Sequence, residues 1–167
     1  MAETLHIPEQ ASKEQVYESI LPQISALIEG EQSLIANLAN ITAVLDTAFS
    51  HLWTGFYLME GDILVLGPFQ GPIACTRIPV NPIARGVCGV AAKEQKTQLV
   101  ADVEKFEGHI ACSSLARSEI VVPLIGSDGK TKLVLDIDSA DLKSFDEIDQ
   151  SFCEQIIDMI KGQHFND

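Results

Sequence analysis

The residues best suited to chemistry in this sequence are its cysteines, which occupy positions 75, 88, 112 and 153. Cys112 lies in the polar segment Gly-His-Ile-Ala-Cys-Ser-Ser between two predicted strands, where a partly exposed thiol is a candidate nucleophile. Cys88 follows Arg85 near the start of a predicted short helix. We expect the helix dipole and the guanidinium to lower the pKa of the Cys88 thiol. Cys153 follows Phe152 in a predicted amphipathic helix, which favours a small buried residue.

Three carboxylates are predicted to share one face of a β-sheet. Side chains alternate in direction along a strand, so Asp136 and Asp138 point to the same side of the segment 132–138. Glu119 occupies the corresponding face of the preceding predicted strand. Such a group can recognise an amine substrate. Periodicity alone favours the simpler interpretation, a solvated sheet face, and does not decide between the two.

Two aromatic residues are predicted to lie beside these carboxylates. Trp53 and Tyr57 are four positions apart on a predicted strand, so they fall on one face, with Gly55 between them. The missing side chain of Gly55 predicts an open notch between two aromatic walls, which could hold a small ligand. Ordinary core packing is the alternative interpretation, because aromatic side chains dominate protein cores.

A zinc site is the other chemistry that the cysteines suggest. Cys75, Cys88 and Cys112 could form one together with His109. However, the sequence contains no Cys-x-x-Cys pair and these four residues are scattered along the chain. We therefore expect no metal and no other cofactor.

The composition indicates one folded domain without an anionic partner. The chain has 167 residues, 46% of them hydrophobic, which is typical of a single globular domain. Its formal net charge of -13 would repel a nucleic acid backbone or an anionic membrane surface. The polar N-terminus lacks the basic start and apolar run of a secretion signal, and no apolar segment is long enough to span a membrane. We expect a cytoplasmic protein.

The pattern of apolar residues predicts an α+β fold. Helical spacing predicts helices at 13–29 and 34–47 and a closing helix that begins with a capping box formed by Ser144 and Glu147. Alternating or β-branched runs predict mostly antiparallel strands, with one inserted helix near 84–93. The predicted strands are 52–59, 62–67, 73–79, 97–100, 120–125 and 132–138. This order predicts one domain at 13–163 after an N-terminal tail at 1–12.

Five motifs occur in an order that resembles a known family. They are Cys75-Thr76-Arg77-Ile78-Pro79, Arg85-Gly86-Val87-Cys88-Gly89, Gly108-His109-Ile110-Ala111-Cys112, Ser118-Glu119-Ile120-Val121 and Leu135-Asp136-Ile137-Asp138-Ser139. On these motifs the chain resembles the free methionine-R-sulfoxide reductases, which are single GAF domains. The likeness runs from about Trp53 to the closing helix. One departure is the 13-position spacing from Cys75 to Cys88, which is longer than usual in that family and includes Asn81 and Pro82.

The resemblance implies a role for each of the residues singled out above. It implies that Cys112 is the catalytic cysteine and that Cys88 and Cys75 are resolving or recycling cysteines. It also implies that the substrate pocket is lined by Trp53, Tyr57, Glu119, Asp136 and Asp138. By the same resemblance, thioredoxin is the final reductant, and the terminal helices pair in a homodimer.

These residue types suit the reduction of a sulfoxide. A thiolate would attack the sulfoxide sulfur while an acid protonates the departing oxygen, which leaves a Cys112 sulfenic acid. That acid would condense with Cys88 or Cys75 to form a disulfide. Two alternatives stay open: a non-enzymatic GAF sensor that binds a cyclic nucleotide, haem or bilin, and a thiol redox switch. A carboxylate-rich pocket fits an anionic phosphate poorly.

Overall fold

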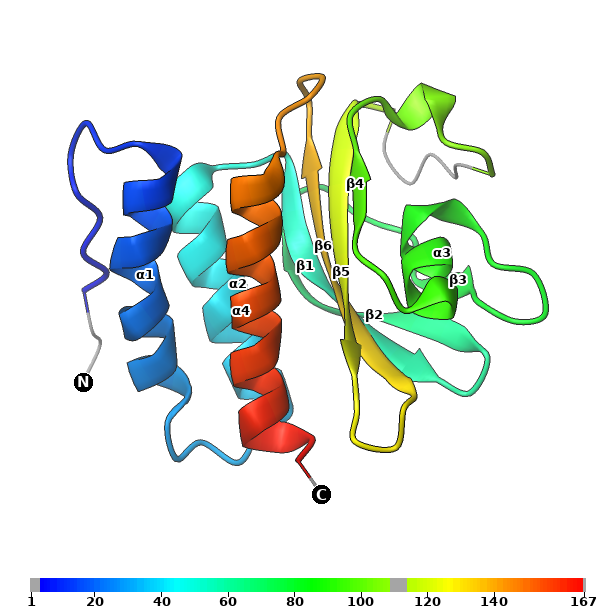
Figure 1. Ribbon diagram of the computed structural model, residues 1–167, viewed down its shortest axis with the longest axis horizontal. Helices are drawn as coiled ribbons and strands as arrows, with labels where there is room; N and C mark the ends of the chain where they lie inside the picture. Colours follow the sequence, from blue (N-terminus) through cyan, green and yellow to red (C-terminus); the bar gives the residue numbers. More distant parts are fainter. Residues whose placement is uncertain (1–3, 109–113, 167) are drawn as a thin grey trace.

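The computed structural model describes residues 4–108 and 114–166, so the catalytic cysteine inferred from the resemblance, Cys112, lies outside the described residues. The described chain forms three layers, with an antiparallel sheet in the middle and helices on both sides (Figure 1). Helices α2 (Leu34–Phe49) and α4 (Glu147–His164) cover one face of the sheet, and α1 (Lys13–Ile28) packs against these two helices. Helix α3 (Gly86–Glu94) covers the other face. The predicted α+β fold is confirmed.

The sheet has six strands in the order β3-β2-β1-β6-β5-β4, and each neighbouring pair is antiparallel. The strands are β1 (Trp53–Glu60), β2 (Ile63–Gln70), β3 (Arg77–Pro79), β4 (Gln98–Val100), β5 (Ser118–Ile125) and β6 (Thr131–Ser139). A short 3₁₀ turn at Val103–Lys105, which the sequence analysis did not predict, follows β4. The long central strands β1, β6 and β5 carry the residues predicted to line a site.

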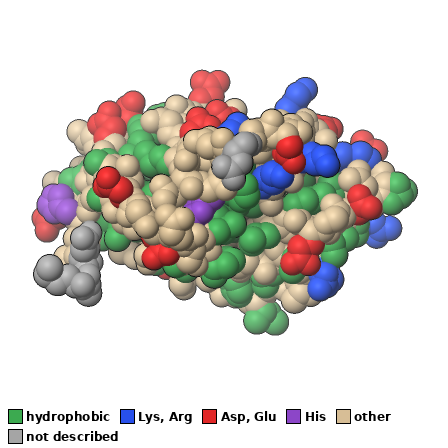
Figure 2. All heavy atoms as spheres, turned by 90° about the horizontal axis from the view of Figure 1, so that it is seen from below, with side chains coloured by type: hydrophobic (Ala, Val, Ile, Leu, Met, Phe, Trp, Pro, Cys, Tyr) green, Lys and Arg blue, Asp and Glu red, His purple; other side chains and the backbone are tan. Residues whose placement is uncertain are grey.

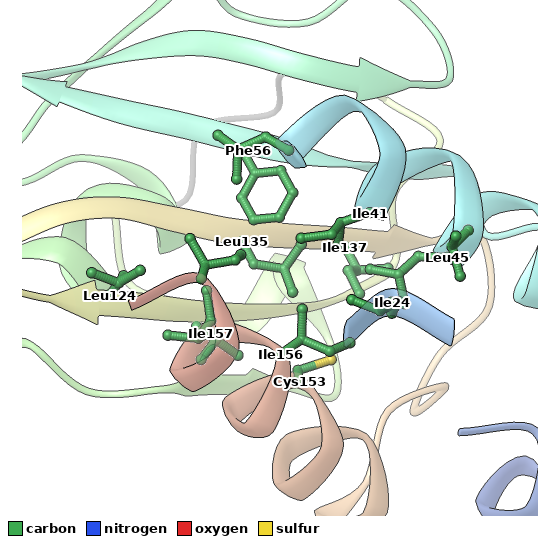
Figure 3. Close-up of a cluster of buried hydrophobic side chains, with 14 of the residues drawn as sticks. Ile24, Ile41, Leu45, Phe56, Leu124, Leu135, Ile137, Cys153, Ile156 and Ile157 are labelled. Atoms are coloured by element: carbon green, nitrogen blue, oxygen red, sulfur yellow. The ribbon is translucent and has the colours of Figure 1, made fainter. Parts of the chain in front are cut away.

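The larger core lies between the sheet and the three-helix layer. It is built from the apolar stripes of these helices and from one face of the strands, including Phe56, Leu135 and Ile137 (Figure 3). Cys153 of α4 is fully buried in it, as predicted. Each large apolar side chain that leaves water here contributes about 1.5–3 kcal/mol to folding. This core therefore supplies most of the stability of the domain.

A second, smaller apolar cluster covers the opposite face of the sheet. Here Val121 of β5 and Val134 of β6 pack with Val87 and Ala91 of α3. Both faces of the central strands are therefore buried, and the solvated sheet face favoured by periodicity is wrong. Two of the three carboxylates on this face are buried as well, since Glu119 is 7% exposed and Asp136 is 5% exposed, whereas Asp138 is half-buried.

The closing helix begins at a different cap from the one predicted. Asp146 is the N-cap, and its side chain accepts hydrogen bonds from the backbone N–H groups of Ile148 and Asp149. Lys13 of α1 forms ion pairs with both Asp146 and Asp149, so a contact with a distant helix favours this cap. The hydroxyl of Ser144, the residue predicted to be the cap, instead donates to Ser139 Oγ at 2.7 Å.

Charge is spread over the surface. Figure 2 shows Asp and Glu side chains distributed from end to end of the visible face, with Lys and Arg side chains mainly towards the end that carries α3. Within the described part of the chain, none of the helices is both long and apolar enough to cross a membrane.

Candidate functional site

The site forms where α3 crosses the two central strands β5 and β6. Residues of one strand face are brought together by register, because Glu119 lies opposite Asp138 and Val121 lies opposite Asp136 in the β5–β6 ladder. Cys88 projects from α3 onto the same place. Its thiol lies 3.2 Å from Asp136 Oδ2 and 4.0 Å from Glu119 Oε1. One thiol and two carboxyl groups predicted from separate motifs therefore meet in a buried cluster.

Burial raises the pKa of every carboxyl group in this cluster. The pKa of Asp136 is raised by desolvation to about 6, although hydrogen bonds with Cys88 and Glu119 hold it lower than burial alone would. The pKa values of Glu119 and Asp138 lie well above the ordinary range, first because of burial and then because of the charge on Asp136. Asp136 therefore ionises first, while Glu119 and Asp138 keep their protons to higher pH.

Within the described part of the chain, one oxygen of Asp136 has no hydrogen-bond partner. Asp136 Oδ1 is buried and accepts no hydrogen bond from a donor among the described residues. A proton on Glu119 can be donated to Asp136, which is one reason why the two groups titrate together. A buried acceptor of this kind costs about 1–3 kcal/mol when it is unsatisfied. The cluster is therefore built to take up a proton or a cationic group.

The expectation that the Cys88 thiol is acidic is wrong. Burial, followed by the charges of Asp136 and Glu119, raises its pKa well above the ordinary value. Arg85, which was expected to stabilise the thiolate, is exposed to solvent at the N-cap of α3, and its side chain makes no capping hydrogen bond. Cys88 is a free thiol that donates a hydrogen bond to Asp136 rather than an activated nucleophile.

Aromatic rings form a wall beside the acidic cluster. Trp53 and Tyr57 stack with their centroids 5.7 Å apart, which confirms that they share one face. Trp53 also stacks on Phe69 of β2 at 5.3 Å, a residue that the sequence analysis missed. The indole Nε1 of Trp53 is buried and has no hydrogen-bond partner among the described residues. It is a donor that a ligand could use.

The notch predicted at Gly55 is filled. Gly55 lies opposite Phe69 in the β1–β2 ladder, and a Cβ added to this glycine would be 2.4 Å from Phe69 Cβ. The same atom would be 2.7 Å from the Trp53 ring. Glycine is therefore required so that the two rings can stack directly against the strand. The residue helps to form the aromatic wall and does not leave a cavity in it.

Tyr57 connects this wall to the loop that carries Cys75. Its hydroxyl donates to the backbone carbonyl of Cys75 at 3.0 Å. Burial, and then the charge of Asp136, raises the pKa of Tyr57, so the hydroxyl keeps its proton. Cys75 is disulfide-bonded in the structure, whereas Cys88 and Cys153 are free thiols. Cys75 is therefore held beside the aromatic wall and is able to form a disulfide.

A curled antiparallel sheet with helices on one face, and a small site under a helix on the other, is the architecture of a GAF domain. The family model described as "GAF domain" matches residues 31–160. The chain therefore belongs to the GAF domain family.

Comparison with known proteins identifies relatives of this chain. The chain is 55% identical to "GAF domain-containing protein A" of Dictyostelium discoideum, with 96% of this chain and 99% of the relative covered. It is 40% identical to the free methionine-R-sulfoxide reductase of Saccharomyces cerevisiae, with 95% and 91% covered. The X-ray structure of the free methionine-R-sulfoxide reductase of Neisseria meningitidis in complex with its substrate superposes with a TM-score of 0.90. That enzyme is 47% identical, with 96% of this chain and 94% of the other covered.

Proposed function

We propose that this protein is an oxidoreductase that reduces free L-methionine-(R)-sulfoxide to L-methionine. The observation that carries the proposal is the acidic cluster beside the Trp53–Tyr57 wall, in which Glu119 and Asp136 are buried and Asp138 is half-buried. The proposal is also supported by relatives at 40% and 47% identity that are named for this reaction and match nearly the whole chain. The domain that performs it spans residues 13–163.

The site offers a small amino acid a negative charge and an apolar wall beside it. An ionised Asp136 offers its unpartnered oxygen to the substrate ammonium group. Trp53 and Tyr57 enclose the S-methyl end of the side chain. A residue within a polypeptide lacks the free ammonium group, so recognition of that charge selects the free amino acid over a methionine sulfoxide in a protein.

Cys112 is the nucleophile in this proposal. Its thiolate attacks the sulfoxide sulfur, the S–O bond of the substrate breaks, and the oxygen ends on the cysteine as a sulfenic acid with a net uptake of one proton. The methionine sulfur gains two electrons and the cysteine sulfur loses two. Glu119 or Asp138 is the proton donor, because each has a pKa raised far enough to remain protonated near neutral pH.

The sulfenic acid is then removed by a second thiol. Condensation of a Cys112 sulfenic acid with a thiol gives a disulfide and one water. We propose Cys75 as this thiol, since its sulfur is disulfide-bonded, whereas the Cys88 thiol is buried and has a raised pKa. Cys88 then acts later, when the disulfide is reduced. Two electrons from a dithiol such as thioredoxin return both cysteines of the disulfide to thiols. The proposed enzyme is cytoplasmic and forms a homodimer through its terminal helices.

The test is methionine formation from each sulfoxide epimer with dithiothreitol as reductant. We expect turnover of the R epimer only, and its loss in Cys112→Ser because a hydroxyl is a far weaker nucleophile than a thiolate. Cys153→Ser is the matched control, since that thiol is fully buried in the core on the opposite face of the sheet. Substantial turnover by Cys112→Ser would place the nucleophile elsewhere.

The disulfide-bonded Cys75 also fits a second function, a thiol redox switch. A switch would be oxidised stoichiometrically without turning over the sulfoxide, so it would release no methionine. The same assay separates the two, because a catalyst releases many equivalents. The sensor alternative requires an anionic ligand or a cofactor, which the buried carboxylates disfavour.

A further inference from the structure

We propose that Cys88, Glu119 and Asp136 form a binding site for one thiophilic divalent cation such as Zn²⁺ or Cd²⁺, and that this cation competes with the amino group of the substrate. The binding itself is independent of the proposed function. Only the competition rests on it. This set differs from the one considered in the sequence analysis, which combined three cysteines with His109.

The ligand atoms are spaced as a tetrahedral site requires. One atom each from Cys88, Glu119 and Asp136 all lie within 4.8 Å of one another. Zinc bond lengths of ~2.3 Å to sulfur and ~2.0 Å to oxygen place sulfur and oxygen ligands about 3.5 Å apart at a tetrahedral angle. The observed Sγ to oxygen distances of 3.2 Å and 4.0 Å lie on either side of that value. Small side-chain movements would therefore complete the site.

No positively charged side chain among the described residues pairs with the cluster. Asp136 is 5% exposed, yet its Oδ1 atom has no hydrogen-bond donor among the described residues. None of the ion pairs formed by the described residues involves Glu119, Asp136 or Asp138. Asp138 lies opposite Glu119 in the ladder and adds a further carboxyl group. Protons or a cation must therefore balance the charge of this cluster.

The mixture of ligands determines which cations bind. A thiolate selects soft or borderline ions, whereas Mg²⁺ and Ca²⁺ require sites built only from oxygen atoms. When the metal–sulfur bond forms, the Cys88 thiol releases its proton to solvent, and any carboxyl group that becomes a ligand does the same. Binding should therefore strengthen as the pH rises.

Competition follows from the shared carboxylate. The proposed function assigns Asp136 Oδ1 to the substrate ammonium group, and a cation bound through Asp136 Oδ2 would neutralise the same negative charge. Bound Zn²⁺ should therefore raise the KM for the sulfoxide and leave kcat at saturating substrate unchanged. Excess zinc would reversibly inhibit the reductase.

The binding test uses the reduced Cys75→Ser/Cys112→Ser variant, in which Cys88 and Cys153 are the remaining thiols. We expect Cd²⁺ to give thiolate-to-metal charge-transfer absorption that saturates at one ion per chain, and Mg²⁺ to give none. Adding Cys88→Ser should abolish the signal, whereas adding Cys153→Ser should leave it intact. Adding Asp136→Asn should weaken Cd²⁺ binding at least ~10-fold, since it replaces a charged carboxylate ligand with a neutral amide.

Two results would overturn the proposed metal site. One is absorption that survives Cys88→Ser. The other is unchanged Cd²⁺ affinity in Asp136→Asn, provided that thermal melting shows this variant to be folded. Failure of the reductase assay alone would remove the competition and leave the Cd²⁺ result standing, so the two proposals fail separately. If Asp136→Asn does not fold, Glu119→Gln provides the same comparison.

Discussion

Replacing Asp136 with asparagine should lower activity and raise stability at the same time. In the proposed complex this carboxylate holds the substrate ammonium group, and a hydrogen bond to a charged group contributes about 1.5–3 kcal/mol. Its loss corresponds to a fall of about 10- to 100-fold in kcat/KM. The folded protein itself loses no partner of Asp136 Oδ1, because that atom has none among the described residues.

The gain in stability follows from the pKa of this group. Asp136 has a pKa of about 6 in the folded protein, against an ordinary value of 3.8. An acid whose pKa is raised by folding destabilises the folded state once the pH exceeds the unfolded value, and the full penalty is present above the folded value. A shift of about two units corresponds to at most about 3 kcal/mol. The amide carries no charge and avoids this penalty.

The assay combines steady-state kinetics for the R epimer with urea unfolding at pH 4 and pH 8. We expect the free energy of unfolding of Asp136→Asn to exceed that of the wild type at pH 8, and the difference to shrink towards pH 4. Asp158→Asn on the exposed face of α4 is the control and should change neither quantity. If Asp136→Asn is less stable than the wild type at pH 8, or retains full kcat/KM, the reasoning about this cluster is refuted.

Three further predictions concern other parts of the molecule. Cys75→Ser should release about one methionine per chain but lose sustained turnover with thioredoxin, because the proposed disulfide cannot form. Full turnover with thioredoxin would exclude Cys75 as the resolving thiol. Tyr57→Phe removes the 3.0 Å hydrogen bond to the Cys75 carbonyl and should cost about 0.5–1.5 kcal/mol in urea unfolding. An unchanged unfolding midpoint would show that this bond contributes nothing. Leu135→Ala should cost about 2–5 kcal/mol, since Leu135 is fully buried in the larger core. A loss below 1 kcal/mol would contradict that placement.

The direction of the strand side chains could be predicted from the sequence because backbone geometry fixes it. Apolar and acidic residues alternate along β6, so Leu135 and Ile137 had to share one face and Asp136 and Asp138 the other. What covers the acidic face could not be predicted in this way. The pattern of one strand does not reveal that α3, from a different part of the chain, packs on that face.

Local rules failed where distant contacts dominate. The position of Cys88 at the third residue of α3 indicated an acidic thiol, but Asp136 and Glu119 are 48 and 31 positions away along the chain and raise its pKa. The cap of α4 is a similar case. Both Ser144 and Asp146 fit a capping pattern, and the ion pair of Lys13 with Asp146 favours the second. The sequence around Phe69 did not predict that this residue belongs to the aromatic wall, because its position there depends on pairing with Gly55 of the neighbouring strand.

Leu135 and Asp136 show that folding stability and the proposed function depend on opposite faces of one strand. They are neighbours in β6, yet Leu135 packs in the larger core and Asp136 lies in the acidic cluster. The raised pKa of Asp136 shows that its ionised form destabilises the fold, and the apolar core on the opposite face must offset that cost. Selection for folding alone would remove this carboxylate. Opposite effects of Leu135→Ala and Asp136→Asn on stability would therefore identify the cluster as a feature kept for binding.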